Sequence, residues 1–190
     1  MTSLKKLSLS VCALMITATL HAQLAVAQLI MKGQPATGLG GFFHGGIPLT
    51  KNSEIGLEAG FDYFAPNQSH LIFVPLLAGY RHFFGSSVTS AAGTGFYLEP
   101  FVGYTIGNTD IQKVDAAGNP VFNSDSTDVD QKASGATAGL CIGYILPSRS
   151  YPLNFGLHFE HVFVSGDPSA SMLSLRISWS LFAARRSQQH

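Results

Sequence analysis

The chain has 190 residues, and its eleven basic and eleven acidic side chains leave no basic excess that could attract nucleic acid. Only 12% of the residues are charged, whereas ordinary soluble domains carry about 25%. The hydrophobic fraction is nevertheless 46%, with 20 glycines and 14 phenylalanines. Low charge without long apolar runs is typical of barrels whose strands give only every second residue to lipid.

The N-terminus has the three parts of a secretory signal peptide. Lys5-Lys6 forms a basic start, and residues 7–20 form an apolar run that is too short to span a bilayer. Ala25-Val26-Ala27 then supplies a small-x-small cleavage site, with Ala22 as the second choice. We therefore predict that residues 1–27 are a signal peptide.

Residues 28–182 are then predicted to form one small domain, followed by a polar tail at 183–190. Removing the signal peptide takes away two lysines and no acid, so the mature net charge is 9 − 11 = −2. Cys141 becomes the only cysteine, which rules out an intramolecular disulfide.

Apolar and polar residues alternate with period two along most of the chain, which predicts β-strands. The clearest segment is SEIGLEAGFDYF at 53–64, where apolar residues alternate with acids and glycines. Acids spaced by glycines suit a narrow, crowded interior, so the apolar face is predicted to contact lipid. Seven strands are predicted in this way: 37–49, 53–64, 70–84, 95–106, 134–146, 153–163 and 171–182.

An eighth strand follows from topology, because bacterial single-chain barrels have even strand numbers. Only residues 23–34 can supply it, so we predict a short, irregular first strand there. The predicted fold class is all-β: an antiparallel, up-and-down transmembrane β-barrel of eight strands. Turns at 48–52, 85–94 and 147–152 then lie on the periplasmic side.

The long segment 107–132 lies on the extracellular side in this topology and has no period of its own. Its strand-proximal ends could extend the hairpin above the membrane, while its composition predicts a mobile, solvated loop. The loop carries five acids: Asp110, Asp115, Asp125, Asp128 and Asp130.

The strand sequences also resemble a known family. GGFFHGGIPL, EIGLEAGFDYF, FVPLLAGYRHFF, GFYLEPFVGYTIG, GLCIGYIL, LNFGLHFEHV and LSLRISWSLF are similar to the eight-stranded outer-membrane β-barrel proteins common in Bacteroidota. In that family a PLLAGYRHFF-type strand precedes a YLEPFVGY strand, as it does here. The resemblance covers most of residues 37–182 and implies an OmpX-like or OmpA-like barrel with no shared catalytic residues.

Charged residues on the predicted inner faces form the candidate site. Counting across the predicted hairpins places Arg81 beside Glu54 and Glu99, and Arg176 near His158 and Glu160. One interpretation is a polar relay or pore lining; the one we favour is charge pairing that fills the lumen, because eight strands leave room only for side chains or one small ligand. The predicted lumen network is Glu54, Glu58, Asp62, Arg81, Glu99, His158, Glu160 and Arg176.

Two other chemistries are less well supported. His158, Glu160, His161 and Ser165 suggest a lipid A deacylase, but Glu160 faces away from His161 and the tight His-x-Ser spacing of those enzymes is absent. Asp125, Asp128 and Asp130 suggest a Ca²⁺ loop, but lack the spacing and glycine of an EF-hand. We therefore predict no enzyme, no cofactor and no metal.

The predicted function is that of a structural or surface-interaction barrel in the outer membrane. The alternatives are a lipid-modifying enzyme and a soluble lipocalin-like binding barrel, which would hold its apolar faces inside. The predicted partners are outer-membrane lipid, the barrel-assembly machinery and an extracellular partner of the acidic loop, with no nucleic acid. We expect a monomer.

Overall fold

The computed structural model describes residues 19–31, 35–65, 70–84, 95–107, 110–112, 130–146, 152–164 and 169–180. Every regular element in these ranges is a β-strand. No helix long and apolar enough to cross a membrane occurs in the described part of the chain.

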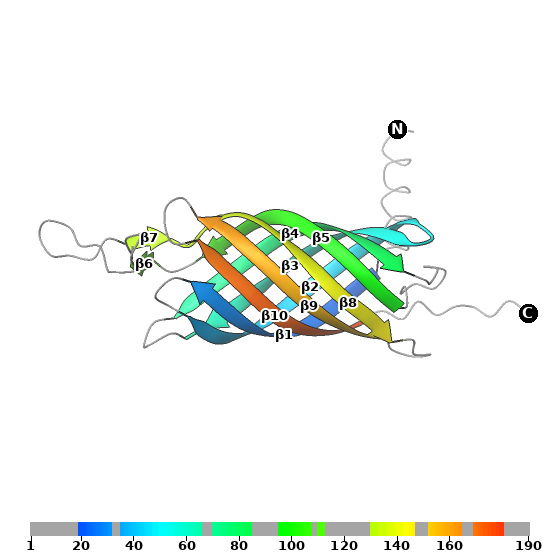
Figure 1. Ribbon diagram of the computed structural model, residues 1–190, viewed down its shortest axis with the longest axis horizontal. Helices are drawn as coiled ribbons and strands as arrows, with labels where there is room; N and C mark the ends of the chain where they lie inside the picture. The colour runs from blue at the N-terminus through cyan, green and yellow to red at the C-terminus, as the bar shows by residue number, and fades with distance from the viewer. Residues whose placement is uncertain are drawn as a thin grey trace, which may run out of the picture.

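Eight strands close into one antiparallel barrel (Figure 1), which confirms the predicted fold class. Neighbours around the barrel follow the order β1-β10-β9-β8-β5-β4-β3-β2, so strands that follow one another along the chain pair, and the first strand, β1, pairs with the last, β10. The strands are β1 Thr19–Met31, β2 Ala36–Thr50, β3 Ser53–Phe64, β4 Leu71–Phe84, β5 Gly95–Gly107, β8 Gly135–Leu146, β9 Leu153–Val164 and β10 Ala170–Ser180.

The first strand differs from its prediction. β1 has 13 residues and pairs without a bulge to both β10 and β2, so it is neither short nor irregular. It begins at Thr19 and not at residue 23. The prediction was wrong because the signal peptide was assigned as far as residue 27, and the alanine-rich sequence at 22–27 also suits one wall of a barrel.

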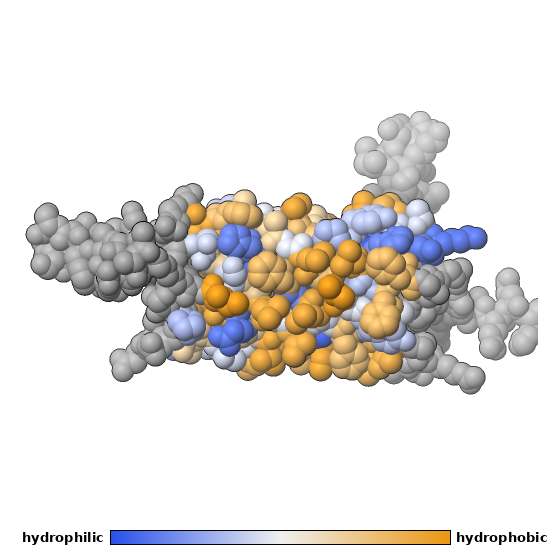
Figure 2. Space-filling model, in the orientation of Figure 1, coloured by the Kyte–Doolittle hydropathy of each residue, from blue (hydrophilic) through white to orange (hydrophobic). Residues whose placement is uncertain are grey.

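The predicted facing of the other seven strands is confirmed. In β3, for example, Leu57 is 67% exposed, whereas Glu54 and Asp62 are buried. Figure 2 shows the result on one side of the molecule, where apolar side chains form a broad belt across the barrel wall. This arrangement is the reverse of a lipocalin-like barrel, which the structure therefore contradicts.

The barrel has two distinct ends in Figure 1. At one end, here called the terminal end, β1 begins, β10 finishes and β2 turns into β3. At the other, here called the loop end, β5 leads through the hairpin of β6 (Asp110–Gln112) and β7 (Asp130–Lys132) into β8. The β6–β7 hairpin lies at the end opposite to the start of β1 and the end of β10, which matches the predicted topology. Its pairing also confirms that the strand-proximal ends of 107–132 extend the hairpin.

The turn predicted at 48–52 is shorter than expected. β2 continues to Thr50, with a register shift between Pro48 and Thr50, and only Lys51 and Asn52 form the turn. A proline is tolerated at such an irregularity because it interrupts the ladder in any case. The predicted turn at 85–94 lies outside the described residues, as does most of 147–152.

Side chains fill the interior in layers. A buried apolar cluster lies at the loop end and includes Leu29, Phe64, Leu71 and Phe73. A second cluster, with Phe83, Tyr97, Phe101 and Ile145 among its members, occupies one side of the lumen between the middle and the terminal end. The charged residues lie between and beside these clusters, so the fold concentrates them in the middle of the barrel.

Candidate functional site

The centre of the lumen holds Arg81 between two carboxylates from the neighbouring strands. Its guanidinium lies 3.0 Å from Glu54 of β3 and donates to Glu99 of β5 at 2.7 and 2.9 Å. The β3–β4 register places Glu54 directly opposite Arg81. The predicted bridge across three strands is therefore present, and all three side chains are buried.

Tyr97 supports this bridge on one side. The Arg81 guanidinium lies 4.4 Å from the centre of the Tyr97 ring, a cation–π contact. The Tyr97 hydroxyl donates to Asn154 at 2.9 Å and lies 3.7 Å from the Cys141 sulfur. Cys141 is thus a buried packing residue of this layer.

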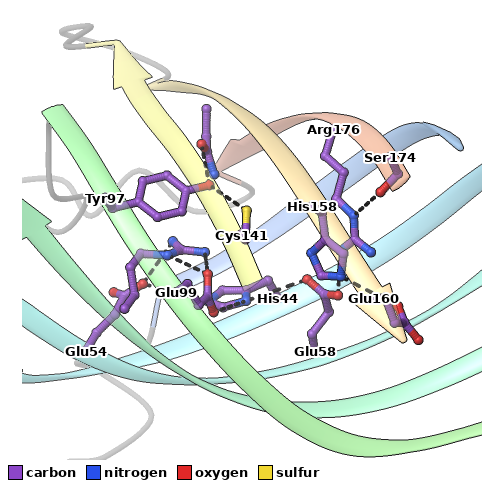
Figure 3. Close-up of polar contacts among 12 residues, drawn as sticks. His44, Glu54, Glu58, Tyr97, Glu99, Cys141, His158, Glu160, Ser174 and Arg176 are labelled. Atoms are coloured by element: carbon purple, nitrogen blue, oxygen red, sulfur yellow. Dashed lines mark hydrogen bonds and ion pairs between the residues drawn. The ribbon is translucent and has the colours of Figure 1, made fainter. Parts of the chain in front are cut away.

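His44 is a member of the network that the sequence analysis missed. Its ring lies among three carboxylates, with nitrogen–oxygen distances of 3.7 Å to Glu54, 3.9 Å to Glu58 and 3.8 Å to Glu99 (Figure 3). The inner-face position of His44 was visible in the alternation of 37–49. The β2–β3 register places His44 directly opposite Glu58, so counting across that hairpin could have found this partner. Glu99 lies on β5, which is not adjacent to β2, and strand counting could not find that contact.

Arg176 forms an ion pair with a carboxylate on the opposite side of the lumen. On β10 it lies opposite Gly156, one inward-facing position away from His158. Its guanidinium reaches across the lumen to Glu58 on β3 and lies 3.8 Å from the centre of the Phe42 ring. The predicted position of Arg176 near His158 and Glu160 is therefore confirmed, but its ion pair with Glu58 was not predicted, because the long side chain spans the interior of a narrow barrel.

His158 and Glu160 form a separate polar group in β9. The Glu160 carboxylate accepts a hydrogen bond of 2.8 Å from Thr105, whose hydroxyl in turn accepts one of 2.8 Å from Thr137. His158 lies 3.6 Å from Glu160 and stacks on Phe101 with ring centres 4.2 Å apart. Asp62 is buried in β3 facing the same lumen.

Glycines make room for these large side chains. A Cβ at Gly56 would overlap the His44 ring, and one at Gly79 would lie 2.7 Å from a Glu99 oxygen. The acid–glycine alternation that marked β3 as an inner face thus has a direct packing cause: each glycine is the place where a neighbour's side chain lies.

The remaining space in the lumen is small. A cavity of about 20 Å³ is lined by residues that include His44, Glu58, Arg81, Glu99 and Arg176, and such a volume holds about one water molecule. No group of three or more His, Cys, Asp or Glu residues in the described ranges is arranged to hold a metal ion. The geometry therefore supports charge pairing and packing more than transport.

The acidic loop is described only at its two ends. Asp110 and Asp130 lie in β6 and β7, where the register pairs Asp110 with Lys132 and Gln112 with Asp130. The other three predicted loop acids, Asp115, Asp125 and Asp128, lie outside the described residues.

One polar pair lies on the outer wall near the loop end. The Nδ1 atom of His161 on β9 is 2.8 Å from the hydroxyl oxygen of Ser171 on β10, and the ring packs edge-on against Phe163. His161 is on the opposite face of β9 from His158 and Glu160, so the four residues first considered for hydrolysis do not form one site. Ser165 lies outside the described residues.

The same fold occurs in solved outer-membrane proteins. Neisserial surface protein A matches with a TM-score of 0.57 and 12% identity, over 85% of this chain and 96% of that one. Ail, the attachment invasion locus protein of Yersinia pestis, matches with a TM-score of 0.56 and 7% identity, over 86% of this chain and 95% of that one. No protein-family model and no curated protein sequence matches the chain.

At these identities the likeness shows the fold alone. This chain has the closed, eight-stranded antiparallel β-barrel fold of small outer-membrane proteins. The sequence-based resemblance is confirmed at that level.

Proposed function

We propose that the protein is an outer-membrane β-barrel with a structural or surface-interaction role, and that its lumen is closed by side chains. The observation that carries the proposal is the combination of an apolar outer wall with a charged, filled interior. Leu57, Leu175 and Phe96 are each more than 60% exposed on the wall, whereas Arg81 and Arg176 are buried inside. Exposing so many apolar side chains to water would be unfavourable, which favours lipid around the wall. Charged side chains would be unfavourable on a wall that contacts hydrocarbon, and here they are inside.

The proposed partner of the wall is outer-membrane lipid, and the barrel-assembly machinery is the proposed route of insertion. The chain is proposed to act as a monomer without a cofactor, and its relation to Bacteroidota-type barrels is part of the same proposal. The names of the two similar proteins, a surface protein and an attachment invasion locus protein, support a surface role by analogy only.

Membrane fractionation tests the location. The protein should fractionate with the outer membrane and run at different apparent sizes in unboiled and boiled gel samples, because a closed barrel resists detergent until it is heated. Recovery in the soluble periplasmic fraction with no shift would contradict the proposal.

The loop end is proposed to face the outside of the cell. Its β5–β8 connection is the longest between barrel strands, and barrels of this type have short periplasmic turns and longer external loops. Proteases added to intact cells should cut within 113–129. Protection of that segment, with cleavage at 85–94 instead, would invert the topology.

The acidic loop is the proposed recognition segment. The loop has five aspartates and only two basic residues, Lys113 and Lys132. This excess of negative charge favours a basic or cationic partner such as a polyamine or a basic peptide. Binding of a basic peptide to whole cells should weaken as salt rises and should be lost when the aspartates are changed to asparagine. Unchanged binding by that variant would show that recognition lies elsewhere.

The His161–Ser171 contact favours one second candidate, a lipid hydrolase whose hydroxyl nucleophile lies on the wall. A serine activated by histidine also needs the histidine to be oriented, and the nearest acid in sequence, Glu160, points into the lumen. Mass analysis of membrane lipid from cells expressing wild type and Ser171→Ala tests this candidate. Identical lipid profiles would remove it.

A further inference from the structure

We propose that export processing occurs at the Ala22–Gln23 peptide bond, so that the mature barrel begins at Gln23 and keeps Ala25-Val26-Ala27 in its wall. Water would add across that bond, leaving a carboxylate on Ala22 of the released peptide and an amino group on Gln23. The inference rests on the proposed export to the outer membrane.

β1 closes the barrel by pairing with both β2 and β10 (Figure 1). The two cleavage sites leave very different lengths of this strand. Cleavage after Ala27 leaves 31 − 28 + 1 = 4 residues of β1, and cleavage after Ala22 leaves 31 − 23 + 1 = 9. A strand that spans a membrane at a tilt needs about 9–11 residues. Only the earlier site leaves a strand of that length.

The backbone pairing of β1 leads to the same conclusion. Of the eleven residue pairs between β1 and β10, nine remain after cleavage at Ala22 but four after cleavage at Ala27. Of the eleven pairs with β2, seven remain in the first case and two in the second. The later cut would leave facing edges of β2 and β10 unpaired in hydrocarbon, where backbone groups have no water to bond.

The small residues at 25 and 27 have another explanation than protease recognition. Both face the lumen and are buried, with Ala25 opposite Arg176 and Ala27 opposite Ser174 on β10. Between them Val26 is 56% exposed on the apolar wall. The Ala-Val-Ala sequence is therefore explained by a strand whose residues face in, out and in again, with small inward side chains that leave room for the Arg176 guanidinium.

The residues around the Ala22–Gln23 bond are consistent with cleavage there. Ala22 presents the small side chain that processing requires next to the cut, although Leu20 is larger than the usual residue two positions before it. Gln23 lines the central cavity with His44 and Arg176, and the lining of this cavity includes none of residues 19–22. Of the lumen side chains whose burial the structure describes, His21 alone would be lost with the signal peptide.

The test is the N-terminal peptide of the full-length gene product, purified from the outer membrane in its heat-shifting form and read by mass spectrometry. The expected first residue is Gln23, with its amine free or cyclised. Ala22→Leu should accumulate uncleaved precursor, because a large residue then precedes the cut. Ala22→Ser, the matched control with a small side chain, should give the wild-type mature mass.

The outcomes separate the inference from the proposal it rests on. A mature chain that begins at Gln28, in the heat-shifting form, would overturn the cleavage site and leave export standing. Uncleaved protein with no outer-membrane fraction would overturn export itself. Normal maturation of Ala22→Leu to a Gln23 N-terminus would also contradict recognition at Ala22.

Discussion

At the scale of single residues, Arg81 is the side chain on which the interior depends most. Removing one partner of a buried ion pair costs about 3–5 kcal/mol, because the other charge stays buried and unpaired. Arg81→Leu leaves both Glu54 and Glu99 without their cation, so the free energy of unfolding should fall by about that amount. Urea unfolding in lipid vesicles, followed by tryptophan fluorescence, measures it.

Two further variants make this test specific. Adding Glu54→Gln and Glu99→Gln to Arg81→Leu should recover part of the loss, since the buried negative charges are removed. Tyr80→Leu changes the adjacent lipid-facing residue, which is 43% exposed, and should leave the urea midpoint close to wild type. A wild-type midpoint for Arg81→Leu would mean that the bridge contributes no stability.

Gly56 gives a second prediction at this scale. Gly56→Ala places a methyl group against the ring of His44, and overpacking of this kind typically costs about 1–3 kcal/mol. Gly41→Ala is the matched control in the neighbouring strand, because its nearest contact is the Phe61 ring at 3.2 Å, on the lipid-facing wall where the ring can shift. The urea midpoint should fall for the first variant and stay near wild type for the second.

The sequence predicted residue contacts well where they lie between adjacent strands. Arg81 with Glu54 and Glu99 followed from counting out of two turns, because register fixes which residues face each other. Arg176 with Glu58, and His44 with Glu99, cross the lumen between strands that are not paired. Those contacts depend on barrel closure and side-chain reach, which no strand pattern encodes.

At the scale of the elements, the β5–β8 connection should be separable from the barrel. β5 and β8 share eleven residue pairs within the barrel, from Gly95–Ile145 to Thr105–Gly135, whereas β6 and β7 share three. Replacing residues 110–132 with an Asn-Gly turn removes only the second set, and that turn type suits a hairpin. The variant should keep the heat-induced gel shift of the wild type.

The same variant distinguishes scaffold from recognition segment. Binding of a basic peptide to cells should disappear while the barrel persists. A loss of the gel shift would show instead that the β6–β7 hairpin is required for the barrel to form. The control for loop length is a variant in which uncharged loop residues are deleted and all five aspartates are kept.

Among the elements, the sequence identified seven strands correctly because each shows both faces clearly. β1 was underestimated because the features of an export signal and of a narrow barrel wall overlap in the same residues. Leu24, Val26 and Ile30 are more than half exposed on the wall, and Ala25 and Ala27 are buried. That alternation is present in the sequence, but Ala25-Val26-Ala27 was interpreted as the cleavage site of the signal peptide.

At the scale of the whole molecule, the filled interior predicts that the protein is not a pore. An apolar cluster fills the loop end, and the central cavity has a volume of about 20 Å³. Purified protein in planar bilayers should therefore give no steady large-conductance steps, under conditions in which a general porin added as control does. Stable large channels would contradict a lumen closed by side chains.

The pairing of β1 with β10 also determines when folding can finish. The paired residues are 170 − 31 = 139 to 180 − 21 = 159 positions apart, so the chain must be almost fully made before its first strand finds its last neighbour. Contacts between such distant residues form slowly, and until they form two strand edges are open to other chains. Closure must therefore come at the end of folding, and the interval before it is when the chain is most exposed to aggregation.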